Sequence, residues 1–500
     1  MAKLSPKPYP PGNYPVIVVG SGPGALQTSY CLSRLGVEHA VISVEPGPGG
    51  MFRRFPNFDR LISWTKPFAP AKPGTRDYIR YDMNSLIGDT AAHNALVRPY
   101  MDDVSYFPSR SAMQKGLRDF AQKGKVKVRY GCDWEGTRKT KEGFKVTTSD
   151  GVYGAKLLVF AVGVTKPWIP SYIPGIKLAT HYADLLPASK YSGKRVFIVG
   201  KRNSAFEVAN GLLTRASQLI LASPSPLKVS LDVAHPESAR VVYLQPYEDA
   251  VLGGGHLVLD ATITKIARGR NGFRVTTSGT TRPGDLIFDV DEVIATTGFE
   301  APLRDLAKLG VSLFGQKSLP AQTNFWESST VPGIYFAGSI TQGSAGLNKY
   351  GRQSNSGVVH GFRHNARVLA RHIATTHYGY KPRRRLIAPE DVTSFLLSEA
   401  SRSPEIWNQK SYLARVLAFE DNGEVVDQWF QPLANFVDSA GPPAVAITIE
   451  TDPTGTIRPA LYVRRLGNVE EHILDPNILS DFETDDHQAK VSSLLKGLVD

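Results

Sequence analysis

The pattern of hydrophobic and polar positions predicts alternating strands and helices at the start of the chain. A β-branched run at Val16–Val19 is followed by apolar residues at helical spacing over Ala25–Leu35 and by a second strand-like run at Ala40–Val44. A strand–helix–strand order of this kind is typical of a βαβ unit, which opens a parallel sheet. Between about residues 46 and 110 the periodicity is lost, and irregular stretches of this length usually wrap a ligand or serve a function.

The strand–turn–helix pattern recurs once, at Arg195–Gly200 and Ala205–Leu213. The remaining predicted helices are 111–122, Ser354–Thr376 and a short one near the C-terminus. Further strands are predicted at Lys125–Val128, Phe144–Thr148, Leu157–Val162, Leu219–Ala222, His256–Leu259, Phe273–Thr277, Glu292–Thr296, Ile334–Ala337, Ala414–Phe419, Ala444–Glu450 and Ala460–Arg464. We expect an α/β fold with two Rossmann-like dinucleotide-binding domains, one inserted in the other, plus a small α+β C-terminal module. The expected boundaries are 1–190 for the first part of one domain, 191–300 for the other, 301–378 for the return segment and 379–500 for the module.

Composition narrows the class of protein. The chain has 500 residues, of which 42% are hydrophobic and 21% charged, so a disordered or fibrous chain is excluded. The longest apolar runs are far shorter than the ~20 residues that cross a bilayer. Two cysteines, Cys31 and Cys132, exclude a disulfide framework and a C-x-x-C dithiol or metal site. Without a leader signal, we expect a cytoplasmic protein with neither a membrane nor a metal partner.

The charge balance favours anionic small molecules as ligands. Lysine and arginine outnumber aspartate and glutamate by 58 to 46, a formal net charge of +12. A nucleic-acid-binding protein would show clustered basic residues interleaved with exposed aromatics. The one dense cluster, Lys381–Arg385, has the character of a linker with a solvated face, so we expect no nucleic-acid partner.

The first glycine-rich turn carries the clearest chemistry. Gly20, Gly22, Pro23, Gly24 and Ala25 stand between the first strand and the first helix. The first glycine permits a tight turn, the second lets the backbone approach a pyrophosphate, and the small third residue lets helix and strand pack closely. A pyrophosphate there would meet unpaired amides at the helix N-terminus. A glycine turn without a ligand is the alternative.

Residues after this turn favour FAD as the dinucleotide. Glu45 ends the second strand, where a carboxylate accepts hydrogen bonds from ribose hydroxyls. The pair Gly49-Gly50, followed by Met51 and Phe52, would let the chain pass close to a flavin. The aromatic residues of the following loop, Phe55, Phe58, Trp64 and Phe68, are individually more typical of a core. Ile334–Ser339 is a short strand that ends in Gly338 and Ser339, beside the expected flavin chain.

The second turn, which comprises Gly200, Arg202, Asn203 and Ser204, is expected to bind NAD(P)H. Arg202 stands at the second glycine position, where it would either pair with a phosphate or mark a lobe that no longer binds a nucleotide. The following strand ends at Ser223 without a carboxylate for a 2′-hydroxyl, which favours NADPH over NADH.

Together these motifs resemble the flavin-containing monooxygenase superfamily, whose members have two dinucleotide-binding domains. The motifs, in order, are GSGPGA, Glu45, GGMF, GKRNSAFE, ATTGF and IYFAGS. Stretches such as Arg80–Leu86 and Ser356–Arg363 resemble more closely the FAD-dependent oxidoreductase branch typified by the ER flavoprotein associated with degradation. The resemblance implies that Gly20, Gly22, Gly24 and Glu45 hold the ADP half of FAD, that Met51, Phe52, Trp64, Asp82, Gly338 and Ser339 lie along the rest of it, and that Gly200, Asn203 and Ser204 face NADPH.

The resulting hypothesis is an FAD-dependent, NADPH-using monooxygenase that acts on a small organic substrate with O2. Two alternatives remain open: a reductase or oxidase that never inserts oxygen, and a flavin-bound scaffold whose second nucleotide site is degenerate. Because the flavin does the bond chemistry in such enzymes, no catalytic base is required and none is assigned. His360 and His364 in the long helix are expected to be satisfied or solvent-facing residues. The sequence leaves open the substrate and whether the chain forms a homo-oligomer.

Overall fold

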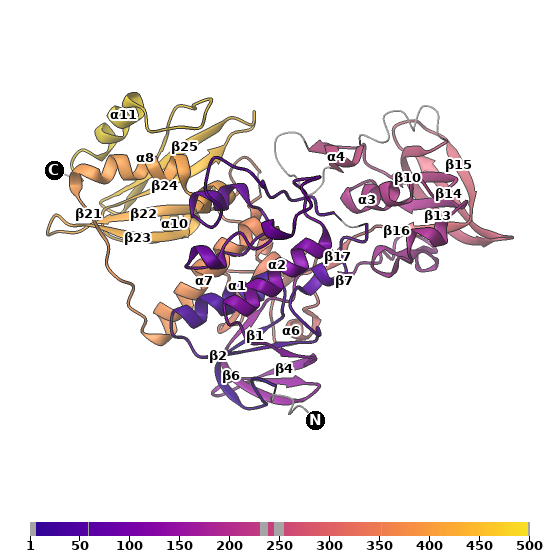
Figure 1. Cartoon of the computed structure of the whole chain (residues 1–500), viewed down its shortest axis with the longest axis horizontal. Helices are drawn as coiled ribbons and strands as arrows, with labels where there is room; N and C mark the ends of the chain where they lie inside the picture. The colour runs from indigo at the N-terminus through magenta and orange to yellow at the C-terminus, as the bar shows by residue number, and fades with distance from the viewer. Residues whose placement is uncertain (1–6, 59, 231–238, 245–254, 352, 499–500) are drawn as a thin grey trace. The chain divides into compact units, whose positions relative to one another are not determined.

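The computed structural model describes residues 7–58, 60–230, 239–244, 255–351 and 353–498, so the first six residues of the leader lie outside it. The chain packs as two compact units (Figure 1). One unit comprises residues 1–53, 63–164 and 301–500, and the other comprises 54–62 and 165–300. Among the described residues, no helix combines the length and apolar character that crossing a bilayer requires.

The larger unit is built on a seven-stranded sheet with the order β3-β2-β1-β6-β5-β4, in which β20 also pairs with β6. Its strands are β1 (Asn13–Val19), β2 (His39–Ser43), β3 (Arg129–Tyr130), β4 (Trp134–Thr140), β5 (Gly143–Thr148), β6 (Gly151–Phe160) and β20 (Ile334–Phe336). Strands β3, β2, β1, β6 and β20 are parallel, and β5 and β4 extend the sheet as an antiparallel hairpin. β1 is buried from Val16 to Val19, and the core continues across β2 and β6.

Helices cover this sheet and connect its strands. They are α1 (Pro23–Arg34), α2 (Arg110–Lys123), α6 (Arg304–Lys308) and α7 (Val359–Tyr378), and a small hairpin pairs β18 (Leu313–Phe314) with β19 (Leu319–Pro320). α1 packs against α7, which brings residues more than 300 positions apart into contact. The long helix begins at Val359 and not at Ser354, because residues 355–357 form a separate 3-10 turn. The described residues between 46 and 109 form 3-10 turns, loops and isolated bridges, with no α-helix and no strand, as the missing periodicity predicted.

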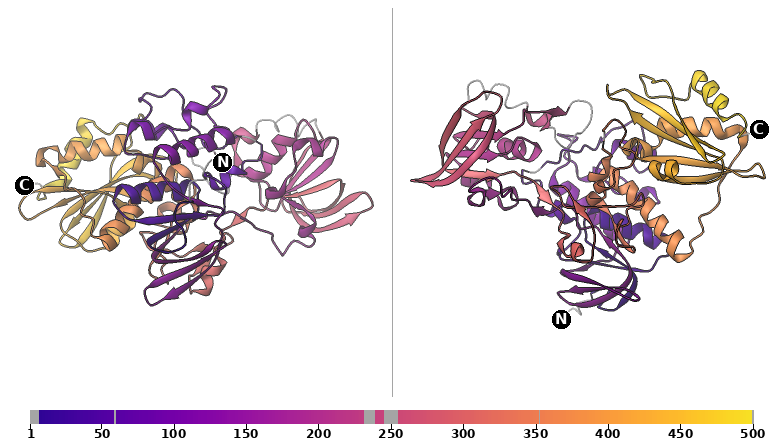
Figure 2. Two further views of the ribbon diagram at one scale, coloured as in Figure 1. Left: turned by 60° about the horizontal axis from the view of Figure 1, so that its bottom comes forward. Right: turned by 180° about the vertical axis from the view of Figure 1, so that it is seen from behind.

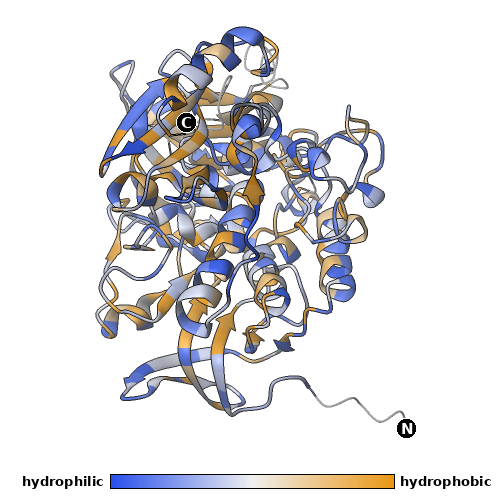
Figure 3. Ribbon diagram, turned by 90° about the vertical axis from the view of Figure 1, so that its left-hand side faces the viewer, coloured by the Kyte–Doolittle hydropathy of each residue, from blue (hydrophilic) through white to orange (hydrophobic). Residues whose placement is uncertain are grey.

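The C-terminal module (residues 379–500) is part of the same unit and forms a six-stranded antiparallel sheet with the order β21-β23-β22-β24-β25-β26 (Figures 1 and 2). Its strands are β21 (Leu386–Ile387), β22 (Leu413–Phe419), β23 (Val425–Pro432), β24 (Ala444–Thr451), β25 (Ile457–Arg465) and β26 (Asn468–Ile473). Its helices are α8 (Val392–Arg402), α9 (Pro404–Asn408), α10 (Leu433–Asp438) and α11 (Asp485–Leu495). β22 and β24 are buried along their whole length, and orange hydrophobic segments are most evident on strands in Figure 3.

The smaller unit, like the larger one, is built on a seven-stranded sheet. The strand order of this sheet is β15-β14-β13-β10-β9-β16-β8. Its strands are β8 (Thr180–His181), β9 (Arg195–Val199), β10 (Gln218–Ser223), β13 (Leu257–Gly269), β14 (Gly272–Gly279), β15 (Asp285–Val290) and β16 (Glu292–Ala295), and its helices are α3 (Asn203–Leu212) and α4 (Val241–Leu244). Two short pairs, β11 (Val229–Ser230) with β12 (Ala239–Arg240) and β7 (Lys166–Pro167) with β17 (Phe299–Glu300), complete it. In both units the strand before the glycine turn lies centrally between two parallel neighbours.

The expected α/β class is confirmed, and one predicted strand is wrong. Residues Lys125–Val128 form a turn and loop, and the parallel pairing with β2 begins only at Arg129. The alternating lysines and valines of this segment match a half-buried strand, but the backbone amide of Val126 bonds to Ala121 in the preceding helix. The chain therefore closes the helix before it enters the sheet.

Candidate functional site: two glycine turns before helices

The first glycine turn leaves the N-terminus of α1 uncapped. Gly20 has φ of 128°, and a Cβ atom there would lie 2.5 Å from the Ala161 carbonyl oxygen, so only glycine fits. Gly22 is the N-cap residue and offers no side chain, and Pro23 follows as the first helical residue. The amides of the first turn of an α-helix have no partner within the helix. They are therefore available to an anion.

Three glycine segments from distant parts of the sequence meet at this turn. A Cβ atom on Gly24 would lie 2.4 Å from the Gly338 Cα, and one on Gly50 would lie 2.9 Å from the Gly22 Cα. A Cβ atom on Gly22 itself would meet only the Gly50 Cα, at 3.8 Å, so space remains beside Gly22. The structure thus brings together the residues expected at the pyrophosphate and at the flavin chain. Ala25, next along α1, is fully buried.

Glu45 is tied to the same turn by serine hydroxyls. The Ser43 hydroxyl accepts a hydrogen bond from the Glu45 amide at 3.2 Å and donates one to the Ser21 hydroxyl at 2.8 Å. The Glu45 carboxylate lies 3.6 Å from Nε of Arg53, and its side chain is 19% exposed. A carboxylate is thus held at the end of β2, next to the glycine turn.

The other residues expected along the flavin lie on two short 3-10 turns. Met51 and Phe52 belong to η1 (Gly50–Arg53), and Ser339 belongs to η8 (Gly338–Gly343). Each turn begins at one of the two glycines that contact α1. The sequence places these residues far apart, and the packing of glycine on glycine brings them to one place.

Trp64 and Asp82 lie on two segments of the long loop that run side by side. The Met83 amide donates to the Trp64 carbonyl at 3.0 Å, and Asp82 forms an antiparallel bridge with Thr65. The Asp82 Oδ1 atom accepts hydrogen bonds from the Thr65 hydroxyl at 2.7 Å and the Asn84 amide at 3.0 Å. The buried Oδ2 atom of Asp82 has no hydrogen-bond partner in the described part of the chain. Asp82 therefore stabilises the loop through hydrogen bonds to one of its two carboxylate oxygens.

Arg363 is a buried residue to which the sequence analysis gave no role. It is 1% exposed and donates to the carbonyl oxygens of Ser85 at 2.5 Å and Ile79 at 3.0 Å. Burial lowers the pKa of Arg363 to about 10, although the Asp82 carboxylate raises it in part. Arg363 thus joins α7 to the loop that carries Asp82. In the sequence, only its position within a predicted helix distinguishes Arg363 from the other arginines of the chain.

Two of the four histidines of α7, His360 and His364, are buried, so the solvent-facing alternative is wrong for them. His360 is 6% exposed and His364 is 1% exposed. The His364 Nε2 atom pairs with the Asn408 side-chain amide at 3.1 Å, and burial lowers the pKa of His364 well below its ordinary value. The neutral imidazole of His364 therefore joins α7 to α9 and has a structural role.

The second turn, in the smaller unit, repeats the first turn with different side chains. Gly200 has φ of 131°, and a Cβ atom there would lie 2.4 Å from the Thr296 hydroxyl oxygen. Arg202 is the N-cap residue of α3, is exposed, and does not cap the helix with its side chain. Asn203 accepts a hydrogen bond from the Arg240 amide at 2.9 Å, and Ser204 follows half-buried in the first helical turn.

A buried ion pair beside this turn was missed by the sequence analysis. Lys201 is only 4% exposed, and its ammonium pairs with Asp260. Asp260 is aligned with Ser223 across the β10–β13 pairing, where β10 itself has no carboxylate. The hydrogen bonds from Lys201 and Thr281 hold the pKa of Asp260 below its ordinary value. This ion pair is hard to predict from the sequence because Asp260 lies on β13, more than thirty residues after the end of β10.

Neither the cysteines nor a metal cluster offers competing chemistry. Burial raises the pKa of the Cys31 thiol to about 11 and also raises that of Cys132, so both free thiols are poor nucleophiles. In the part of the chain that the structure describes, no three His, Cys, Asp or Glu side chains are arranged to hold a metal ion.

Comparison with known proteins finds relatives and solved structures of the same fold. The mouse "FAD-dependent oxidoreductase domain-containing protein 2" is 27% identical over 437 residues, which are 81% of this chain and 64% of the mouse protein. The chain therefore spans somewhat less than two thirds of the length of that relative. Bacillithiol disulfide reductase from Staphylococcus aureus has the same fold, with a TM-score of 0.58, 17% identity, and coverage of 73% of this chain and 99% of that one. A flavin-containing monooxygenase from Stenotrophomonas maltophilia is similar, with a TM-score of 0.55, 18% identity and the same coverage.

These findings confirm the resemblance to two-dinucleotide-domain flavoproteins. A family model described as pyridine nucleotide-disulphide oxidoreductase matches residues 17–338, which is well over half of the chain and extends from within β1 to Gly338. The chain belongs to the pyridine nucleotide-disulphide oxidoreductase family.

Proposed function

We propose that this protein is an FAD-dependent oxidoreductase that accepts a hydride from NADPH and uses O2 to oxygenate a small organic substrate. The observation that carries the proposal is the meeting of Gly22, Gly50 and Gly338 at the uncapped N-terminus of α1. The family match and the name of the mouse relative support FAD as the cofactor, and the second glycine turn supports a nicotinamide cofactor.

The residues of the first turn fit FAD. The space beside Gly22 admits a diphosphate, and the amides at the start of α1 would donate to its oxygens. Glu45 would accept hydrogen bonds from the ribose hydroxyls of the adenosine half. Met51, Phe52 and Ser339, on the two turns that meet at Gly22, would lie along the flavin half. When bound, FAD supplies the two-electron chemistry with NADPH and O2.

The protein's own contribution is to orient the reactants and to exclude water. The Arg363 hydrogen bonds join the loop over residues 79–85 to α7. Within this loop the Asp82 carboxylate accepts a hydrogen bond from the Asn84 amide, and Asp82 is only 2% exposed. A buried wall of this kind would keep water away from the bound flavin and would need no catalytic base.

The second turn would bind NADPH through charge rather than close backbone approach. Arg202 replaces the glycine at which a backbone would reach the phosphates, and its guanidinium can pair with a phosphate instead. Lys201 provides a second cation, which is neutralised by Asp260 in the structure described. Arg202 therefore favours the phosphorylated nicotinamide cofactor, whereas the charge of Lys201 is already balanced by Asp260.

Anaerobic reduction followed by exposure to air tests the proposal. The purified yellow protein is mixed with NADPH under nitrogen, and bleaching of the flavin absorbance is expected. On admission of air with a substrate, we expect an oxygenated product and less H2O2 than NADPH consumed. Stoichiometric H2O2 with every substrate would contradict oxygenation and indicate an oxidase. No bleaching with either NADPH or NADH would indicate a scaffold.

Arg202→Ala is expected to weaken NADPH binding by ~1.5–3 kcal/mol, the range for a hydrogen bond to a charged group. Titration of the oxidised protein with NADPH and with NADH measures this effect. A loss for NADPH alone places Arg202 at the 2′-phosphate, and an equal loss for both places it at the diphosphate. Arg270→Ala, which removes an exposed arginine at the β13–β14 turn, is the matched control. Unchanged NADPH affinity in the Arg202 variant would contradict this role.

A further inference from the structure

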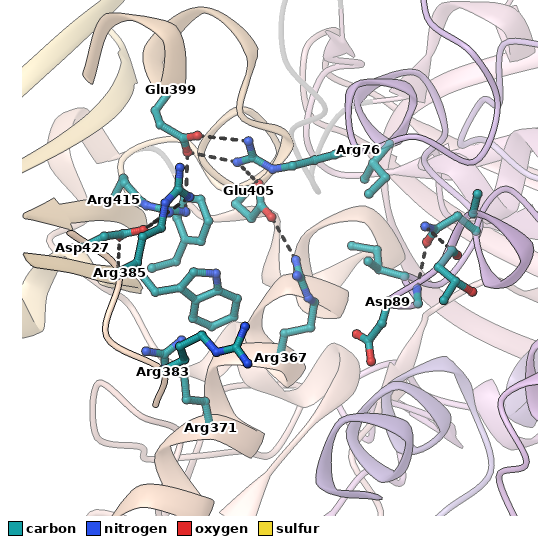
Figure 4. A pocket seen from close by; sticks show the side chains of 18 of the residues that line it. Arg76, Asp89, Arg367, Arg371, Arg383, Arg385, Glu399, Glu405, Arg415 and Asp427 are labelled. Carbon is teal, nitrogen blue, oxygen red and sulfur yellow. Dashed lines mark hydrogen bonds and ion pairs between the residues drawn. The ribbon is translucent and has the colours of Figure 1, made fainter. Parts of the chain in front are cut away.

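The larger unit contains a cavity of about 770 Å³ that the proposed function does not use (Figure 4). Three parts of the chain line it: the loop over residues 74–94, the middle of α7, and the C-terminal module with the linker that leads to it. None of the residues expected to bind FAD or NADPH is among the lining residues. The volume falls within the range of small-molecule sites, which is roughly 300–1,000 Å³.

Seven arginines and four carboxylates line this arginine pocket. The arginines are Arg76, Arg367, Arg371, Arg383, Arg384, Arg385 and Arg415, and the carboxylates are Asp89, Glu399, Glu405 and Asp427. Every carboxylate already has an arginine partner. The pairs are Asp89 with Arg34, Glu399 with Arg76, Glu405 with Arg76 and Arg367, and Asp427 with Arg415. The carboxylates are thus neutralised within the fold, and positive charge is left over.

Arg371 and Arg383 carry this excess charge. Within the described ranges, neither guanidinium makes an ion pair or a side-chain hydrogen bond. Arg371 projects from α7, is half-buried, and has a pKa that burial lowers, whereas Arg383 is exposed on the linker. A cation that is partly removed from water without an anionic partner is costly to keep. An anion in the pocket would compensate this cost.

The arginine pocket also has an aromatic wall that orients its cations. The guanidinium carbons of Arg367 and Arg371 lie 5.3 and 5.0 Å from the centre of the Trp429 ring. The guanidinium of Arg415 lies 4.6 Å from the centre of the Phe430 ring. A guanidinium that packs on an aromatic face still has N–H groups available at its edge for an oxyanion.

Trp429, which forms part of the aromatic wall, has a strained backbone. Trp429 has φ of 69°, a left-handed conformation that is unfavourable for a bulky residue, next to the irregularity in the β22–β23 pairing at Val416 and Leu417. The Asp427 carboxylate accepts a hydrogen bond from the Trp429 amide at 2.8 Å and stabilises the bulge. Strain of this kind gathers at binding sites, where surrounding contacts maintain it.

We propose that the arginine pocket binds a small organic anion that carries at least two negative charges, with Arg371 and Arg383 as the residues that receive its oxyanion groups. Bidentate arginine contacts suit phosphate and carboxylate groups alike. The apolar surface of Ile79, Ile87 and Trp429, which also line the cavity, would hold the organic part. This site is distinct from the FAD and NADPH turns, so its existence does not depend on the reaction proposed above.

Calorimetric titration of the purified, FAD-loaded full chain tests the proposal, with inorganic pyrophosphate and citrate as probes at constant ionic strength. Saturable binding is expected, and the tighter probe tells a phosphate-type ligand from a polycarboxylate. Arg371→Gln and Arg383→Gln are each expected to weaken binding at least tenfold. Arg402→Gln is the control, because it removes the same charge from an exposed arginine that pairs with Glu483 outside the pocket.

Folding and site assignment are checked in the same preparations. Arg383 is exposed on a linker, so its variant should keep the wild-type melting temperature and FAD content. Absence of saturable binding of both probes would overturn the proposal. Binding that persists unchanged in both arginine variants would also overturn it, because the anion would then lie elsewhere, for example at a glycine turn.

Discussion

Replacing Gly22 with alanine is expected to weaken FAD binding by ~1.5–3 kcal/mol, the value of a charged hydrogen bond, which is about 10- to 150-fold in affinity. The backbone of Gly22, with φ of −74° and ψ of 178°, is open to any residue. Its new Cβ would meet only the Gly50 Cα, at an ordinary contact distance of 3.8 Å. The fold is therefore expected to be unchanged, while the methyl group fills the space proposed for the diphosphate.

FAD content after desalting, together with the Kd from fluorescence titration of the apoprotein, measures this effect. Gly12→Ala is the matched control: it adds the same methyl group in the same unit, before β1, with Pro10 O at 3.7 Å as its nearest neighbour. The control should retain FAD as the wild type does. If Gly22→Ala also binds FAD with wild-type affinity, the cofactor does not approach the backbone at this turn.

Replacing Glu405 with glutamine is expected to lower the free energy of unfolding by about 3–5 kcal/mol, the range for removing one member of a buried ion pair. Glu405 is 3% exposed, and its two oxygens pair with Arg76 and Arg367, each at 2.9 Å. The neutral amide would leave both guanidinium groups without this carboxylate.

Urea unfolding at neutral pH measures the loss. Glu483→Gln breaks the pair with Arg402, which is 63% exposed, and this exposed pair should contribute about 1 kcal/mol or less. Equal stability losses in the two variants would show that burial does not strengthen the Glu405 cluster.

The same carboxylate makes stability depend on acid pH. Burial by itself raises the pKa of Glu405, but attraction by Arg76 and Arg367 outweighs burial and holds the pKa far below its ordinary value. The stabilisation is therefore complete above the unfolded pKa, near 4.5, and is lost as the pH falls below that value toward the folded pKa. The unfolding free energy of the wild type should fall with pH in this range more steeply than that of Glu405→Gln. Parallel pH profiles would contradict this assignment.

Local features of the sequence were sufficient to predict the two glycine turns. Gly20 and Gly200 follow β-branched strands directly, and both take the positive φ that only glycine adopts readily. The strand, turn and helix are contiguous in the chain, so periodicity and turn chemistry determine them without distant partners. The α/β class followed from the same signals, and the family match confirms it.

Features that depend on distant contacts were missed. The run Lys381–Arg385 is an exposed linker, as its composition predicts, but nothing in its composition shows that Arg383, Arg384 and Arg385 also line the arginine pocket. Nothing near Lys201 in the sequence indicates that Asp260 neutralises it.

The amino-acid sequence by itself determined the βαβ units, the positions of the glycine turns and the absence of a C-x-x-C pair. These properties depend on neighbours within a few residues. Only the tertiary structure decided that Gly50 and Gly338 meet α1, and that arginines from α7, the linker and the C-terminal module share one cavity. The physical reason is that side-chain charge and backbone contact act over a few ångströms in space. Helix and strand packing sets those distances between residues that are hundreds of positions apart.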